Sequence, residues 1–435
     1  MKRILFAALS VVGVLCVSCT KPAQPAQPAK LAKLAKLAKP AKPAKPVTSS
    51  YPVAEWDSAH VILMHTPGIE LFDGVIHPTA GLFEHYFDVD KAAQEHQAYM
   101  RQLEANGIQV ITLQQVLAAM PLDTLRQLAG QALVYDTDGL LDTDTAANGE
   151  TYRQQTLQVM SREDLIRILF LQPIVHMTSV DNNTGVEATY EHQPLMNLYF
   201  MRDQSITTPR GHIICRMNSL QRRCETAILR AVYRQLGTPA VLEITGEGRL
   251  EGGDYIPAGT VAFIGCGMRT NRQAIRQMFD ADAFGHDTVV VVCDHKFWQM
   301  QMHLDTHFNI IDSDLCTMVA SRLNARRGEP NYVTVDVYAR AKGEKDYHLL
   351  AENVGFVDFM QQRGFTIIPI EEEDELHYAN NFLTIAPRHI MAVAGQSQAL
   401  QQAFKDNGVT VEWIPLDELI NGYGAAHCMT QVLRR

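Results

Sequence analysis

The sequence predicts an α/β fold, on two observations. Short apolar runs bounded by turn residues recur along the chain, as buried strands do. These runs are residues 60–65, 110–113, 132–135, 212–215, 260–264, 288–293, 309–312, 366–370 and 390–394. Helical patterns lie between several of them, at residues 90–106, 219–236 and 396–407, and each ends before a glycine that suits a helix C-cap. The recurring unit is therefore strand, loop, helix, strand.

A second group of helical patterns interrupts this alternation. Residues 123–128 and 151–170 look helical, with little strand pattern between them. We therefore expect one catalytic α/β domain, residues 51–435, that carries a helical insertion at about residues 82–194. A chain of 435 residues can bury a core large enough for such a domain.

The first 50 residues have the composition of a targeting and tethering segment. Lys2 and Arg3 precede an apolar run, residues 4–17, that is too short for a comfortable membrane span. Ser18 and Cys19 follow, so residues 1–18 resemble a bacterial lipoprotein signal peptide that leaves Cys19 lipidated. Leu15 stands one place further from Cys19 than that pattern usually has it, and a simple secretory signal cleaved elsewhere is the alternative.

Residues 19–50 are rich in proline, alanine and lysine, which is typical of an extended tether. We therefore expect the protein in the bacterial cell envelope, lipid-anchored to a membrane on its periplasmic or outer surface.

Charge is divided unevenly between the two parts of the chain. Nine of the 38 basic residues and none of the 48 acidic residues precede residue 51, so the body is strongly acidic. An acidic body argues against a nucleic-acid partner, which needs a basic face. It suits a cationic substrate, although acidic surfaces often serve solubility alone.

The eight cysteines show no metal-binding spacing. The body holds no Cys-x-x-Cys pair and no histidine cluster of zinc-finger spacing, so we expect no structural metal. Cys215, Cys266 and Cys293 lie in or beside apolar runs, where a cysteine usually behaves as a small hydrophobe. The sequence leaves open whether any of the cysteines form disulfides.

Four short segments contain reactive side chains that packing of a hydrophobic core does not explain. They are residues 197–203 (NLYFMRD), 250–254 (LEGGD), 302–306 (MHLDT) and 425–430 (AAHCMT). An aspartate that ends an apolar strand, as we expect for Asp203, needs a partner if it is buried. If residues 302–306 are extended, His303 and Asp305 share a face. The fourth segment places the thiol of Cys428 in a loop of small residues.

Taken together and in this order, the four segments resemble the arginine deiminase family of guanidine-modifying enzymes. The resemblance covers most of the body, from residues 60–68 through Glu95, His96 and residues 106–111 to the four segments themselves. It implies a five-fold pseudo-symmetric α/β propeller, the pentein fold, with the active site on its axis and an early helical module.

The resemblance also implies the roles of the reactive residues. Asp203 and Asp305 would hold a guanidinium group, and Cys428 would attack its central carbon. His303 would protonate the departing amine and then activate water, while Glu251 would keep His303 protonated. Neither a cofactor nor a catalytic metal is required. The partner is a small cationic guanidino compound, and the oligomeric state stays open, a homo-oligomer included.

Substrate choice depends on the residues at the far end of the site. By resemblance Asn197, Arg222 and Arg269 would contact the carboxylate of an amino acid. Members of the family often have an arginine in the approach to the cysteine, and this chain has Tyr423 there, which donates one neutral hydrogen bond and cannot form a charged fork. We favour conversion of L-arginine to L-citrulline and ammonia.

Three alternatives remain open. The first is a deiminase of another guanidine, such as agmatine or a peptidyl arginine, and the second is an amidinotransferase. The third is a non-catalytic binding lipoprotein, which the complete set of reactive residues argues against.

Overall fold

The computed structural model describes residues 51–341 and 344–435. The predicted signal peptide (residues 1–18), the predicted tether (residues 19–50) and the lipidation site Cys19 lie outside the described residues. Within the described ranges, no helix combines the length and the apolar content needed to cross a membrane.

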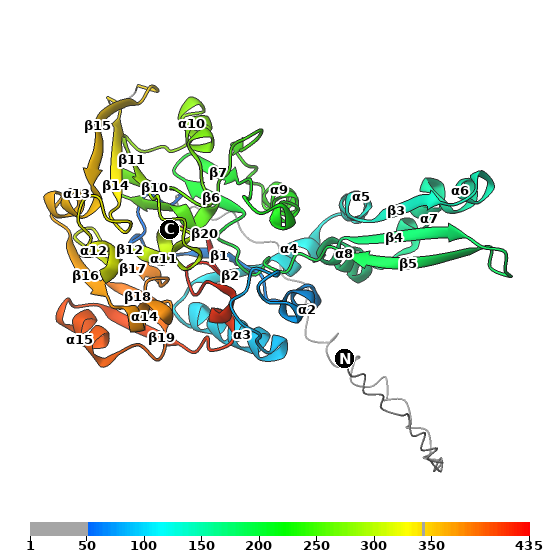
Figure 1. Ribbon diagram of the computed structural model, residues 1–435, viewed down its shortest axis with the longest axis horizontal. Helices are drawn as coiled ribbons and strands as arrows, with labels where there is room; N and C mark the ends of the chain where they lie inside the picture. The colour runs from blue at the N-terminus through cyan, green and yellow to red at the C-terminus, as the bar shows by residue number, and fades with distance from the viewer. Residues whose placement is uncertain (1–50, 342–343) are drawn as a thin grey trace, which may run out of the picture. The chain divides into compact units, whose positions relative to one another are not determined.

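Five sheets share one pattern of three strands (Figure 1). In each sheet the middle strand pairs with an antiparallel strand on one side and a parallel strand on the other. The first sheet joins β20 (Gln431–Arg434), β1 (Val61–Met64) and β2 (Gln109–Thr112), and the second joins β6 (Ser205–Thr208), β7 (Gly211–Ile214) and β8 (Leu242–Glu243). The third joins β9 (Tyr255–Ala258), β10 (Val261–Cys266) and β11 (Thr288–Cys293), the fourth β12 (Phe308–Asp312), β13 (Leu315–Val319) and β16 (Thr366–Ile370), and the fifth β17 (Leu383–Ala386), β18 (His389–Val393) and β19 (Thr410–Ile414).

A helical connection joins the middle strand of each sheet to its parallel partner, because parallel neighbours need a long crossover. The connecting helices are α3 (Val89–Ala105), α9 (Glu225–Gln235), α10 (Arg272–Asp280), α13 (Phe356–Gln362) and α15 (Gln398–Asp406). The remaining helices of the five-sheet body are α2 (Ile69–Ile76), α11 (Leu304–His307), α12 (Ala320–Leu323) and α14 (Glu372–Leu376). The predicted alternation of strand, loop, helix and strand is confirmed.

Helix α3 shows why the local sequence forms these connections. Asp88 accepts a hydrogen bond from the Lys91 amide and caps the first turn, and Gly107 follows the last turn with a φ of 77°. The buried side chains recur at helical spacing, so one face packs against the sheet. The helix predicted at residues 219–236 is wrong at its start, because a short 3-10 turn, Leu220–Arg222, precedes α9.

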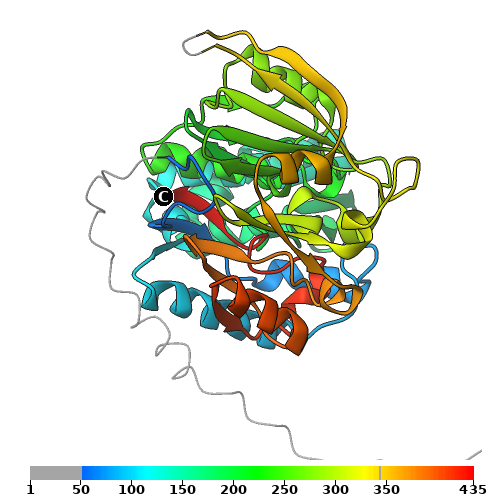
Figure 2. The same ribbon diagram turned by 90° about the vertical axis from the view of Figure 1, so that its left-hand side faces the viewer.

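The third sheet is wider than the others. Two further strands, β14 (Thr334–Ala339) and β15 (His348–Gly355), lie between β13 and β16 in the sequence and pair with each other (Figure 2). β14 also pairs with β11, so the third sheet has five strands. β11 lies inside this sheet and five of its six residues are buried, as its continuous apolar sequence predicts.

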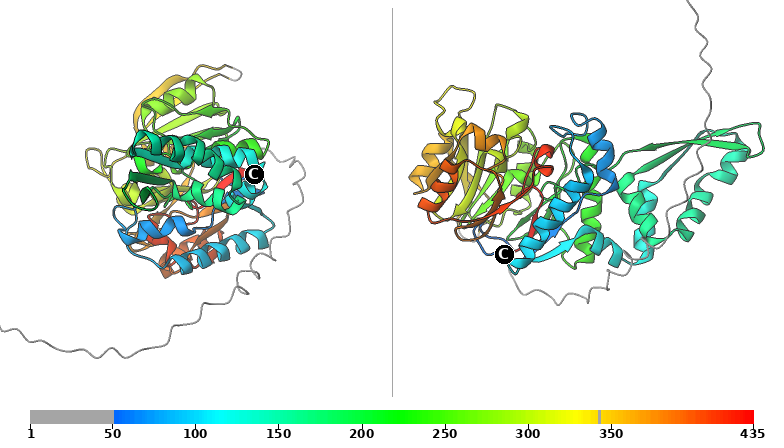
Figure 3. Two further views of the ribbon diagram at one scale, coloured as in Figure 1. Left: turned by 90° about the vertical axis from the view of Figure 1, so that its right-hand side faces the viewer. Right: turned by 90° about the horizontal axis from the view of Figure 1, so that it is seen from below.

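The predicted insertion holds strands as well as helices (Figure 3). Its helices are α4 (Leu113–Ala119), α5 (Leu122–Ala132), α6 (Asp142–Asn148), α7 (Glu150–Val159) and α8 (Arg162–Leu171). A separate sheet joins β3 (Val134–Gly139), β4 (Pro173–Ser179) and β5 (Val186–His192). The purely helical description is therefore wrong. β5 is exposed along almost its whole length, and its apolar residues, Val186, Ala188 and Tyr190, alternate with polar ones without forming the continuous apolar run by which the other strands were predicted.

Candidate active site

Cys428 lies in a buried turn between a 3-10 helix, Leu419–Gly422, and β20. The side chain of Asn381 holds this turn, since its Oδ1 accepts the backbone N–H of Ala425 at 2.9 Å and that of Cys428 at 3.1 Å. The backbone carbonyl of Asn381 accepts the N–H of His427 at 3.0 Å. One asparagine therefore fixes the position of the thiol. The predicted loop of small residues around the thiol is confirmed.

The small residues before Cys428 are required by close packing. A Cβ on Gly424 would lie 2.7 Å from Cε1 of Phe200 and 3.1 Å from Sγ of Cys428. Distances of this size leave no room for a methyl group beside the sulfur.

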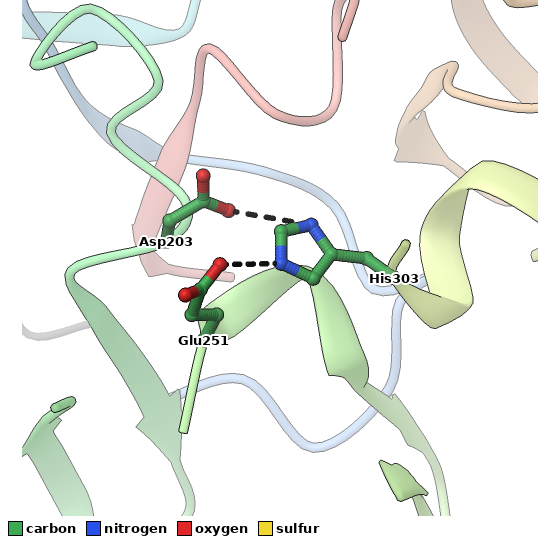
Figure 4. Close-up of side chains that lie close together, drawn as sticks. All are labelled: Asp203, Glu251 and His303. Carbon is green, nitrogen blue, oxygen red and sulfur yellow. Dashed lines mark hydrogen bonds and ion pairs between the residues drawn. The ribbon is translucent and has the colours of Figure 1, made fainter. Parts of the chain in front are cut away.

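His303 lies between two buried carboxylates (Figure 4). Its Nε2 is 2.8 Å from Oε2 of Glu251, and its Nδ1 is 3.8 Å from Oδ1 of Asp203. Burial alone would lower the pKa of His303, but the two carboxylates outweigh burial and raise the pKa to about 9. The imidazole therefore carries a proton at neutral pH.

The segment that carries His303 is not extended throughout, so the condition on which the sequence placed His303 and Asp305 on one face is not met. His303 has an extended backbone and Leu304 begins the short helix α11, so Asp305 lies in the first turn of a helix. The two side chains still lie on the same side, because a Cβ on Gly253 would be within 3.0 Å of both. The shared face is confirmed, and its predicted cause is wrong.

Glu251 connects His303 to two further groups. Its Oε1 accepts the N–H of Asn218 at 2.8 Å, and its Oε2 is 3.9 Å from Nη1 of Arg269. Burial would raise the pKa of Glu251, but the bond to His303 and the charge of Arg269 hold the pKa well below its usual value. Glu251 is thus an anion that stabilises the histidine cation.

Asp203 and Asp305 each have one engaged and one free carboxylate oxygen. Oδ2 of Asp203 accepts Nη1 of Arg222 at 2.8 Å, and Oδ2 of Asp305 lies 2.7 Å from Nδ1 of His427 and 3.6 Å from Sγ of Cys428. Oδ1 of both aspartates is buried with no hydrogen-bond partner in the described part of the chain. Burial would raise the pKa of Asp305, but the hydrogen bond from His427 overrides burial and lowers it.

The segment before Asp203 is also not the strand that the sequence predicts. Residues 196–199 and 201–204 form successive turns. The backbone N–H of Arg202 donates to the carbonyl of Cys428 at 3.0 Å. This bond places Asp203 beside the cysteine turn and explains why the segment cannot join a sheet there.

The thiol of Cys428 is neutral in this environment. Burial, followed by the charges of Asp305 and Asp203, raises the pKa of Cys428 well above its usual value. A cation placed between the two aspartates would reverse this effect, because it would neutralise the carboxylates and attract a thiolate.

The predicted far-end residues line one cavity with Cys428 and Asp203. The lining includes Asn197, Arg222, Arg269 and Tyr423. The cavity holds only about 10 Å³, which is about the space of one water. A guanidino compound therefore enters only after the mouth opens.

Each predicted far-end ligand has a protein partner in this closed arrangement. Arg222 forms a fork on Glu225 with both contacts at 3.0 Å, in addition to its bond to Asp203. Arg269 donates to Oε1 of Gln299 at 3.1 Å. Asn197 donates to the carbonyl of Gly81 at 2.9 Å.

Two residues at the mouth have strained backbones. Leu82 and Tyr423 both line the cavity, and their φ angles are 63° and 66°. A bulky residue in the left-handed region costs about 1–3 kcal/mol and is retained at functional sites and switch segments. The two residues thus place strained backbone on opposite stretches of the chain that line the same cavity.

Asp203, Glu251 and His303 could also hold a metal ion, since one ligand atom from each lies within 4.8 Å of the others. Two observations favour a proton in this position. His303 binds a proton with a pKa of about 9, and the cations of Arg222 and Arg269 already face Asp203 and Glu251.

Sequence reasoning missed three residues that organise the site. They are Asn381, which holds the cysteine turn, His427, which bonds Asp305, and Glu55, whose Oε1 lies 3.4 Å from Nε2 of His427. His427 adjoins the nucleophile, so its position could have been noticed. The other two come from distant parts of the chain and carry no local pattern.

Solved structures share this fold. A dimethylarginine dimethylaminohydrolase from Pseudomonas aeruginosa, solved in complex with citrulline, matches with a TM-score of 0.52 at 18% identity and covers 86% of this chain and 99% of its own. The N-terminal domain of ArgZ, an arginine dihydrolase from the ornithine–ammonia cycle in cyanobacteria, matches with a TM-score of 0.53 at 15% identity and covers 87% and 98%. The likeness defines the class of fold, the mixed α/β fold of these enzymes.

Sequence comparison defines the family. A sequence model of the arginine deiminase family matches residues 80–435. The arginine deiminase of Halobacterium salinarum is 28% identical and covers 89% of this chain and 97% of its own, and that of Staphylococcus haemolyticus is 26% identical and covers 86% and 95%. The chain belongs to the arginine deiminase family, a family of hydrolases that act on C–N bonds of amidines.

Proposed function

We propose that the protein hydrolyses the guanidinium group of L-arginine to give L-citrulline and ammonia. The observation that carries this proposal is the pair of buried, unpartnered oxygens on Asp203 and Asp305, close to the thiol of Cys428 and the imidazole of His303. Two carboxylates placed on either side of a planar cation bind it and fix its orientation. The relatives named arginine deiminase support the same substrate.

The first half of the reaction uses the cation to create its own nucleophile. The guanidinium cancels the charges of Asp203 and Asp305, which lowers the pKa of the Cys428 thiol, and the thiol releases its proton to water. The thiolate attacks the central guanidinium carbon and forms a C–S bond. His303 donates its proton to one amino group, the C–N bond breaks, and ammonia leaves an S-alkylthiouronium on the cysteine.

The second half of the reaction restores the enzyme. Neutral His303 takes a proton from water, and the resulting hydroxide adds to the thiouronium carbon. Collapse of this adduct breaks the C–S bond, the proton of its hydroxyl group passes to the departing sulfur, and the ureido product leaves the neutral thiol of Cys428 restored. Glu251 holds the imidazole in place throughout through its 2.8 Å bond.

At the far end, Arg222, Arg269 and Asn197 would bind the substrate carboxylate after exchanging their present partners. Tyr423 adds one neutral hydrogen bond in place of a charged fork. Because Tyr423 cannot form a charged fork, a substrate without a free carboxylate, such as agmatine or a peptidyl arginine, is the second candidate. An amidinotransferase would pass the amidino group to an amine in place of water.

Turnover by protein that lacks residues 1–46 tests the proposal. Ammonia and ureido product are measured with arginine, agmatine and a blocked arginine peptide. We expect turnover of arginine and none with Cys428→Ala, while circular dichroism shows an intact fold. Turnover of agmatine or the peptide without turnover of arginine would refute the substrate assignment.

We further propose that the five sheets with the shared three-strand pattern form a five-fold pseudo-symmetric propeller. The supporting observation is the repeated order of antiparallel strand, middle strand, helical connection and parallel strand in each sheet. In this arrangement the turns that carry Asp203, Glu251, His303 and Cys428 come from different sheets and converge on one axis.

We also propose that Cys19 anchors the protein to a membrane of the bacterial envelope, with residues 19–50 as the tether. The apolar segment before Ser18 and Cys19 supports this proposal. Cys19→Ala should move the protein from the membrane fraction to the soluble fraction. Unchanged fractionation would count against the anchor.

A further inference from the structure

Asp254 is a buried carboxylate that the proposed mechanism leaves unused. It ends the short 3-10 turn Gly252–Asp254, and its Oδ1 accepts the backbone N–H of Leu304 at 3.0 Å. Leu304 is the first residue of α11 and directly follows His303. Asp254 therefore holds the backbone at the point between His303 and Asp305, the two reactive residues of that segment.

Two glycines leave room for this carboxylate and for the imidazole. A Cβ on Gly265 would lie 2.3 Å from Oδ1 of Asp254, and a Cβ on Gly253 would lie 2.7 Å from Nδ1 of His303. Neither position tolerates a larger residue without displacing one of the two side chains. Each of the two side chains is thus seated against the backbone of a glycine.

The second oxygen of Asp254 adds charge to the site. Oδ2 is buried and has no hydrogen-bond partner across the described ranges, and the charge of His303 and the side chain of Thr270 favour the ionised form of the carboxyl. Burial raises the pKa of the Asp254 carboxyl to about 6, and the carboxylate is still ionised at neutral pH. Its negative charge is among the causes that raise the pKa of His303.

Charged and titratable groups face His303 from every segment packed against it. They are Asp203 from the turn before β6, Glu251 and Asp254 from the segment before β9, Asp305 and His307 from α11, and Arg269, which reaches Glu251 from the loop after β10. Asp203 and Glu251 are already given roles with the substrate or the imidazole. Asp254 is the carboxylate among them that contacts neither and instead bonds the backbone.

We propose that Asp254 is a positioning residue for the hydrolysis. By holding the Leu304 N–H it aims His303 and Asp305 at the reacting carbon, and its charge keeps the imidazole protonated for ammonia release. This inference rests on the proposed function, because it assigns to His303 the role of acid.

The test compares Asp254→Asn with Asp336→Asn in the full-length protein in detergent. Asparagine keeps an oxygen for the Leu304 N–H and removes the charge. Asp336 is an equally buried carboxylate in β14 that pairs with Arg272, so its variant controls for the loss of a buried charge elsewhere. The rate of ureido product formation is measured from pH 5 to pH 10, and the titration of His303 is followed by NMR of the imidazole carbon, assigned with His303→Asn.

In Asp254→Asn we expect the titration of His303 and the pH–rate profile to shift to lower pH. Losing the buried negative charge of Asp254 should lower the midpoint of the His303 titration by about 1 pH unit, and the alkaline limb of kcat/KM should move with it. Asp336→Asn should leave both in place. Gly265→Ala, which crowds Oδ1, should lower kcat by about 10²-fold, as misplacement by about 1 Å does.

Two results would overturn the proposal. One is an unshifted His303 titration in Asp254→Asn with kcat within about twofold of the wild type. The other is a loss of rate that is uniform across pH and matched by a loss of stability, since that pattern belongs to a purely structural residue. If the wild type turns over no guanidine, the proposed function fails, while the NMR titration still decides the role of Asp254.

Discussion

Replacement of Asn381 by alanine tests how the cysteine turn is held. The substitution removes the oxygen that accepts the N–H groups of Ala425 and Cys428, and both groups are buried. A buried donor left without an acceptor costs about 1–3 kcal/mol, so two such donors should lower the free energy of unfolding by about 2–6 kcal/mol. The thiol should also become less acidic, because the nearby side chain of Asn381 is one of the groups that lower the pKa of Cys428.

Unfolding in urea and the rate of citrulline formation measure the two effects. We expect kcat to fall by about 10²-fold, because the turn that aims the sulfur is free to shift. Asn381→Asp, which keeps an acceptor, should recover part of the stability and little of the rate. Asn407→Ala is the control, since Asn407 makes its bond to Ala403 at the end of α15. If Asn381→Ala unfolds within about 0.5 kcal/mol of the wild type and keeps its kcat, the turn is held by other contacts and the reasoning fails.

Three further predictions concern the same site. Gly424→Ala should reduce kcat at least about tenfold, because its methyl group would overlap Phe200 and crowd Cys428, and unchanged initial rates would show that the turn can move aside. Tyr423→Arg should lower the KM for arginine about tenfold through a charged hydrogen bond to the carboxylate while leaving the KM for agmatine unchanged, and an equal fall for both would disprove carboxylate recognition. Burial would raise the pKa of Glu55, but Arg435 and His427 lower it from 4.5 to about 2. The ionised Glu55 therefore contributes about 3 kcal/mol to the free energy of unfolding above pH 4.5, and this contribution is lost as the pH falls toward 2. Glu55→Gln should therefore unfold more easily than the wild type at pH 7 and about equally near pH 2, and a pH-independent difference in urea midpoint would contradict this.

Local sequence was sufficient to predict a strand or a helix end where the residues are buried along a continuous run. The strands predicted at residues 288–293 and 366–370 match β11 and β16 to the residue, because both are short apolar runs, and Gly364 ends the helical turn before β16. Helix ends at Gly107, Gly237 and Gly408 were predicted for the same local reason, since each adopts a positive φ.

Local sequence failed where another part of the chain decides the structure. The strand expected for His303 and Asp305 is a helical turn because Asp254, 50 residues earlier, bonds its first N–H. Asn381 had no recognisable pattern because its role depends on residues more than 40 positions away. The repeated order of strands was also invisible, since the five sheets share a topology and no obvious sequence repeat.

The pairing of β1 with β20 has a consequence for how the chain acquires its structure. The two strands are neighbours in one sheet, and next to them Arg435 pairs with Glu55, 380 residues earlier. Contacts of such long range form late, because the loop between them must first be ordered. During synthesis one edge of β1 therefore stays exposed until nearly all the other sheets have been made, and it can pair with strands of other molecules in that interval. The same late step brings in Cys428, which directly precedes β20, so the protein gains its nucleophile only when the sheet closes.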